Sequence, residues 1–61
     1  MPHRVLIVDD EESIRSSLEK LLRYKGYETF VAEDGFRSLE ILASQTVDVV
    51  LLDIKMPRMD G

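Results

Sequence analysis

The sequence predicts a small α/β fold in which a three-stranded parallel sheet carries two helices, in the order β-α-β-α-β. Two short aliphatic runs each end in an aspartate: VLIV precedes Asp9, and VVLL precedes Asp53. Runs that are apolar on both faces are typical of parallel strands with helices on both sides. Two segments with helical periodicity and one further strand-like segment lie between these runs.

The first half of the chain predicts a strand and a helix. Residues 4–8 are rich in β-branched side chains, which favour extended backbone. A helix is expected from about Glu12 to Lys25, because apolar residues recur there at the spacing of one helical face. These residues are Ile14, Leu18, Leu21 and Leu22. Gly26 is expected to end the helix in the left-handed conformation.

The second half repeats this pattern and ends in the most apolar strand. Residues 27–32 predict a strand that is more exposed than the first, and Asp34 is expected to cap a helix that begins at Gly35. An apolar stripe is expected on one side of this helix. It comprises Phe36, Leu39, Leu42 and Ala43. The last strand, residues 47–53, is expected to be buried, and right-handed crossovers give the strand order 2-1-3.

The composition of the chain argues against several classes of function. The chain has 61 residues, 44% of them hydrophobic, and no cysteine, so disulfides and cysteine metal sites are excluded. A net charge of −4 argues against a nucleic-acid surface, which needs clustered Lys and Arg. No apolar run is long enough to span a membrane, and residues 1–4 do not resemble the start of a signal peptide. A cytoplasmic protein without membrane or nucleic-acid contacts is expected.

Acidic residues gather where two strands are predicted to end. Residues 9–12 are all acidic, and Asp53 follows the last strand. The carboxyl ends of parallel strands meet at one edge of a sheet, which is where open α/β sheets bind ligands. Residues 9–12 could alone be a favourable acidic start to a helix. Together with Asp53 they favour a cation site, because a cation removes the repulsion between neighbouring carboxylates.

Three segments, VLIVDDE, AEDG and VVLLDIKMPRMDG, resemble the receiver domain of two-component response regulators. The resemblance covers essentially the whole chain, with the segments in order and at the expected spacing. It implies a flavodoxin-like (CheY-like) doubly wound parallel sheet, of which this sequence carries the first three strands and two helices.

The resemblance also implies roles for individual residues. Asp53 matches the aspartate that accepts a phosphoryl group from a sensor histidine kinase or a phosphotransfer protein. Asp10 matches the direct ligand of Mg²⁺, and Asp9 matches the carboxylate that holds the ion mainly through water. Asp53 and the backbone carbonyl of Lys55 complete the protein's share of the metal ligands. Mg²⁺ suits this set, since it prefers oxygen ligands and keeps several waters.

The chain departs from the family pattern in extent. A full receiver has five strands, and its fourth-strand Ser/Thr and fifth-strand Lys have no counterpart here. Residues 1–61 are therefore expected to form a truncated receiver domain that self-associates, for example as a dimer, through the unpaired edge of the third strand.

Three hypotheses on function follow. The first is a phosphorelay receiver whose parent protein regulates transcription, because DIKMPRMDG resembles receivers attached to transcription activators. The second is a fragment that cannot transfer phosphoryl groups and self-assembles. The third is a divalent-cation site without phosphoryl chemistry. An enzyme is not expected, since the sequence shows no nucleophile–base pair, phosphate-binding glycine loop or cofactor fingerprint.

Overall fold

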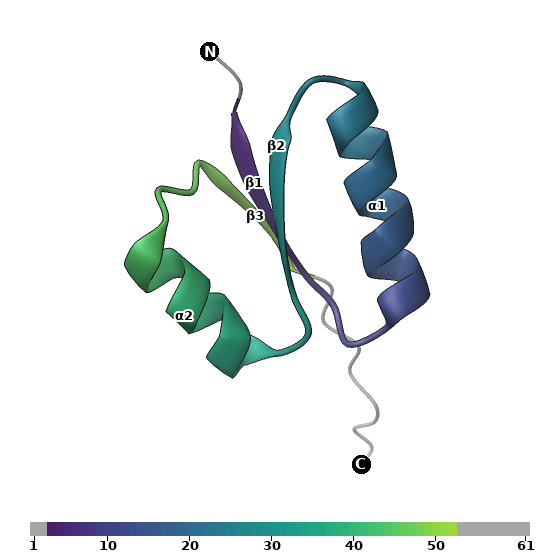
Figure 1. Ribbon diagram of the computed structural model, residues 1–61. Helices are drawn as coiled ribbons and strands as arrows, with labels where there is room; N and C mark the ends of the chain where they lie inside the picture. The colour runs from purple at the N-terminus through teal and green to yellow at the C-terminus, as the bar shows by residue number, and fades with distance from the viewer. Residues whose placement is uncertain (1–2, 53–61) are drawn as a thin grey trace.

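The computed structural model describes residues 3–52, which form a three-stranded parallel sheet with two helices. The elements are β1 (Arg4–Val8), α1 (Glu12–Tyr24), β2 (Glu28–Ala32), α2 (Gly35–Ser44) and β3 (Val49–Leu52). The strand order is β2-β1-β3, and both pairings are parallel. The predicted fold and strand order are therefore confirmed. Figure 1 shows α1 and α2 on opposite sides of the sheet.

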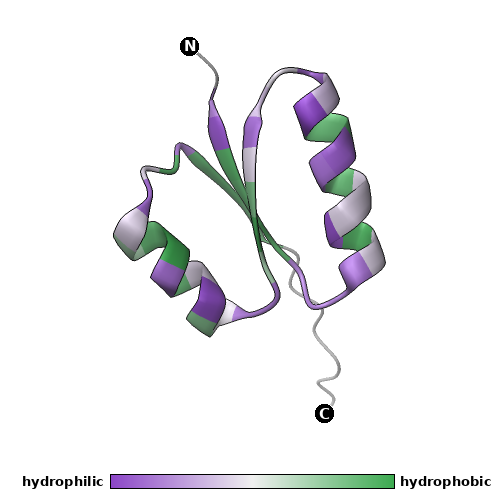
Figure 2. Ribbon diagram, viewed as in Figure 1, coloured by the Kyte–Doolittle hydropathy of each residue, from purple (hydrophilic) through white to green (hydrophobic). Residues whose placement is uncertain are grey.

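The core is built around β1, the central strand. Its residues from Val5 to Val8 are at most 6% exposed, because strands flank both edges of β1 and a helix lies over each face. Val8 is in register with Ala32 on one side and Leu52 on the other. The strands are accordingly the most continuously apolar part of the molecule, whereas α1 alternates polar and apolar residues (Figure 2).

Both predicted helix boundaries are confirmed. Gly26 follows α1 with φ +96°, a conformation that glycine adopts readily because it has no Cβ. The Asp34 carboxylate accepts a hydrogen bond of 2.9 Å from the backbone N–H of Arg37, as expected of an N-cap. Within residues 3–52, no helix combines the length and apolar character that a bilayer crossing requires.

One prediction about burial is wrong, and the apolar stripe predicted on α2 is not the buried face of that helix. On α2 the buried side chain is that of Ile41, whereas Phe36 is 84% exposed and Leu39 is 65% exposed. In β3, every residue from Val49 to Leu52 is exposed rather than buried. Among the described elements β3 contacts only β1, so neither helix covers it. Apolar sequence alone does not bury a strand that has one neighbour and no helix over its faces.

At the amino edge of the sheet, Arg4 of β1 contacts β2 and Asp48, the residue directly before β3. Its backbone N–H donates to the Asp48 carboxylate (2.9 Å), and its backbone carbonyl accepts from the Asp48 N–H (2.8 Å). Its guanidinium pairs with Glu28 at 3.2 Å. These contacts fix the starts of the strands relative to one another, and thus also the alignment of their carboxyl ends.

Candidate functional site

Two connections bring acidic residues together at the carboxyl edge of the sheet. The loop from β1 to α1 carries Asp9 and Asp10, and the loop from β2 to α2 carries Glu33 and Asp34. All four line one hollow of about 260 Å³, together with Val8, Gly35 and Leu52. The hollow is therefore acidic on its polar side and apolar where it meets the strand ends.

Asp9 is the buried member of this group. Only 2% of the residue is exposed, because it directly follows the central strand. Its backbone N–H donates to the carbonyl of Ala32 at the end of β2 (3.1 Å). Its Oδ1 accepts from the backbone N–H of Glu11 (2.9 Å), and its backbone carbonyl accepts from the Arg15 guanidinium (2.7 Å). Asp9 thus joins β1, β2 and α1.

The other acidic residues of the hollow are exposed to solvent. The exposed side chain of Asp10 lies on the rim, one residue beyond the buried Asp9. Glu33 and Asp34 line the hollow as well, although the sequence indicated only a capping role for Asp34. The sequence pattern was sufficient to predict their position. They follow β2 at the same edge of the sheet at which Asp9 and Asp10 follow β1.

Two of the predicted site residues, Asp53 and Lys55, lie outside the described residues. The described part of β3 ends at Leu52, which is in register with Val8 at the same edge. Within residues 3–52, no three Asp, Glu or His side chains are grouped closely enough to hold a metal ion. The described part of the hollow therefore offers carboxylate oxygens suited to Mg²⁺, but only part of a ligand set.

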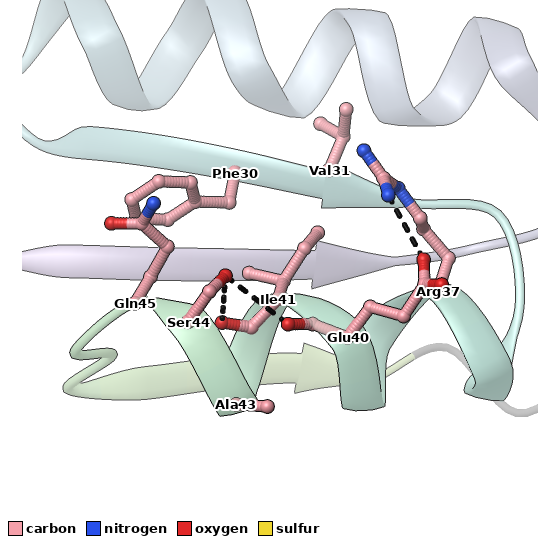
Figure 3. Close-up of a pocket in the computed structure, with 8 residues that line it drawn as sticks. All are labelled: Phe30, Val31, Arg37, Glu40, Ile41, Ala43, Ser44 and Gln45. Carbon is pink, nitrogen blue, oxygen red and sulfur yellow. Dashed lines mark hydrogen bonds and ion pairs between the residues drawn. The ribbon is translucent and has the colours of Figure 1, made fainter.

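A second hollow, of about 640 Å³, lies between α2 and β2 and is a weaker candidate (Figure 3). Its charged groups pair with each other, since the Arg37 guanidinium contacts the Glu40 carboxylate at 2.9 Å. The Ser44 hydroxyl donates to the backbone carbonyl of Glu40 at 3.2 Å. Because these polar groups already have partners, the acidic hollow at the carboxyl edge remains the better candidate site.

A parallel α/β sheet with an acidic carboxyl edge is typical of the receiver domains of two-component signalling. The family model of the response regulator receiver domain matches residues 5–61, and the chain belongs to this family.

Several proteins named response regulator MprA match all 61 residues. The protein from Mycolicibacterium vanbaalenii is 46% identical, that from Mycobacterium ulcerans 44%, and that from Mycobacterium tuberculosis 43%. In each case the match covers 26% of the relative, so the chain spans about a quarter of the length of these proteins. No solved structure matches the chain significantly.

Proposed function

We propose that this chain is the amino-terminal part of a phosphorelay receiver, in which Asp53 accepts a phosphoryl group from a sensor histidine kinase or a phosphotransfer protein. The observation that carries the proposal is the acidic hollow at the carboxyl edge, with Asp9 fixed beneath it and Asp10 exposed on its rim. Family membership supports the same role.

The charge of the hollow favours a cation. Two carboxylates about 4 Å apart repel each other by about 1 kcal/mol in water, and by more when they are partly buried. Four acidic residues line the hollow, so a divalent cation would lower this repulsion. Mg²⁺ is usually bound by one or two carboxylates and keeps several waters. We therefore propose Mg²⁺ as the cofactor, held by Asp9, Asp10, Asp53 and the backbone carbonyl of Lys55.

The different burial of the two neighbouring aspartates supports different roles. The Oδ1 of Asp9 is engaged by the Glu11 N–H, which suits a carboxylate that holds the ion through water. Asp10 is exposed at the rim, which suits a direct ligand. In the proposed transfer, a carboxylate oxygen of Asp53 forms a P–O bond while the P–N bond to the donor histidine breaks. Bound Mg²⁺ would supply the charge neutralisation that a reaction between anions requires.

We further propose that residues 1–61 are part of a longer cytoplasmic response regulator that controls transcription. The chain covers only 26% of the length of the relative from Mycolicibacterium vanbaalenii, which supports a longer parent protein. The net charge of −4 supports a role without direct nucleic-acid binding for these residues. They act as a signalling module and not as an enzyme in their own right.

The test is the intact mass of the chain after incubation with Mg²⁺ and acetyl phosphate. We expect a Mg²⁺-dependent gain of one phosphoryl group that Asp53→Asn abolishes. Asp48→Asn is the matched control, because Asp48 is an exposed carboxylate at the opposite edge of the sheet. A gain that survives in Asp53→Asn, or no gain from folded protein, contradicts the proposed phosphotransfer.

A Mg²⁺-dependent rise in melting temperature tests the metal site separately. A ligand at 100 times its dissociation constant stabilises the folded state by about 2.7 kcal/mol. We expect such a rise in the wild-type chain and its loss in Asp10→Asn. A rise without phosphorylation would favour the third hypothesis, a cation site that lacks phosphoryl chemistry.

The exposure of β3 favours a second candidate function, self-assembly without phosphotransfer. Among the strands that the structure describes, Val49 to Leu52 pair with β1 alone. An apolar hollow of about 640 Å³ beside β3 is lined by Phe36, Leu39 and Leu52, among others. Unpaired apolar strands invite pairing with another chain. We expect light scattering after size exclusion to give the mass of a dimer, and Val50→Lys to reduce it to that of a monomer. A monomeric wild-type chain at micromolar concentration would contradict this candidate.

A further inference from the structure

Three hydrogen bonds hold Asp9, two through its backbone and one through its carboxylate. Ala32 in β2 accepts from its N–H, Glu11 donates to its carboxylate, and Arg15 donates to its carbonyl. The bond from Arg15 is the shortest of the three at 2.7 Å, and its donor is charged. Charged donors make shorter and stronger hydrogen bonds than neutral donors do.

The Arg15 side chain connects the first turn of α1 to Asp9 at the carboxyl end of β1. Its backbone N–H donates to the Glu11 carbonyl (3.1 Å), so the residue belongs to the first turn of α1. Its side chain is partly buried and lies in a groove between α1 and β2, where Glu19 and Val31 also line the surface. The side chain therefore reaches back from the helix to the end of the central strand.

We propose that Arg15 is a positioning residue for the cation site, an inference that rests on the proposed function. The carbonyl that Arg15 holds belongs to the planar peptide unit between Asp9 and Asp10. Fixing this plane restricts the backbone rotation that carries the Asp10 side chain. Arg15 thus sets the direction in which the exposed carboxylate of Asp10 projects, although Arg15 does not itself line the acidic hollow.

The positioning role and the charge of Arg15 predict opposite effects on metal affinity. If only its charge mattered, removing Arg15 would tighten Mg²⁺ binding, because a nearby cation repels the ion. If Arg15 positions the ligands, removing it weakens binding. Loss of an outer contact that orients metal ligands typically lowers metal affinity by about 10-fold to 100-fold. Positioning is therefore expected to dominate, and the sign of the change distinguishes the two effects.

The experiment is a calorimetric titration of the 61-residue chain with Mg²⁺ alone, comparing Arg15→Met with Arg23→Met. Arg23 is the matched control, because its guanidinium also bonds from α1 to the sheet, but to Thr29 Oγ1 in β2 (3.0 Å) near the other end of the helix. We expect Arg15→Met to weaken binding about tenfold and Arg23→Met to change it by less than about twofold. Amide exchange at Glu11 should accelerate only in Arg15→Met, because the Asp9 carboxylate that accepts this N–H is then less well held.

Unchanged or tighter binding in Arg15→Met overturns the proposal. If circular dichroism shows that Arg15→Met does not fold, Arg15→Lys replaces it. This variant keeps the charge but loses the planar guanidinium, so we expect a smaller loss of the same sign, and wild-type affinity would overturn the proposal. If the wild-type chain binds no Mg²⁺ and Asp10→Asn changes nothing, the proposed cation site fails and the role of Arg15 falls with it. Failure of the Arg15 role alone leaves wild-type binding intact.

Discussion

Replacing Leu6 with alanine should remove most of the stability of this chain. Leu6 is 0% exposed in the central strand and packs with Val8, Ala32 and Ile41. The change deletes three buried carbon atoms, worth about 2.4 kcal/mol at about 0.8 kcal/mol each. The cavity left behind raises the expected loss to about 3–5 kcal/mol.

The whole chain has little stability to lose. At about 0.05–0.15 kcal/mol per residue, a chain of 61 residues has an expected unfolding free energy of about 3–9 kcal/mol. For mid-range values, a loss of about 4 kcal/mol from about 6 kcal/mol would leave Leu6→Ala only marginally folded at room temperature. The milder Ile7→Val, at an equally buried position, should cost about 1 kcal/mol and keep a measurable transition.

The assay is urea denaturation followed by far-ultraviolet circular dichroism. Leu39→Ala is the matched control, because it makes the same chemical change at a residue that is 65% exposed. We expect it to change the unfolding free energy by less than about 0.5 kcal/mol. Equal losses in Leu6→Ala and Leu39→Ala would refute the assignment of the core to β1.

Three further predictions concern the helix boundaries and the amino edge, and each is checked by the same denaturation. Gly26→Ala should destabilise by about 1 kcal/mol, since φ is +96°, whereas Gly35→Ala, where a Cβ meets nothing within 4 Å, should stabilise. Equal effects would argue against the left-handed cap. Asp34→Ala should cost about 1 kcal/mol through loss of the cap, and Asp34→Ser should restore most of it. Arg4→Met should cost only about 0.5 kcal/mol, because its ion pair with Glu28 is solvent-screened; a loss as large as that of Leu6→Ala would contradict this.

Local patterns were sufficient to predict the elements, their order and their ends. Residues 4–8 matched β1, and Gly26 and Asp34 marked helix boundaries through chemistry that acts within a few residues. The buried face of α2 could not be predicted in the same way. Apolar residues occur around most of that helix, so only the position of β1 and β2 selects Ile41 for burial.

The candidate site was also partly predictable from local sequence patterns. Asp9 and Asp10 followed from an acidic run after an aliphatic strand, and the structure brings both to one hollow. Glu33 and Asp34 join them because two loops meet at one edge, which the predicted strand order implies, although the sequence indicated only a capping role for Asp34. The contact from Arg15 to the carbonyl of Asp9 could not be predicted from the sequence. The sequence pattern indicates only a solvent-exposed arginine near the start of the helix.

The central place of β1 in the sheet sets an order in which the chain can fold. Val5 pairs with Thr29 across 24 residues and with Val49 across 44 residues. Closing the longer loop costs about 0.5 kcal/mol more entropy than closing the shorter one. On a ribosome, β1 emerges first but must wait for β2 and then β3. Until residue 52 has left the ribosome, one edge of the central strand β1 stays open, and this interval is when the nascent chain most needs protection from aggregation.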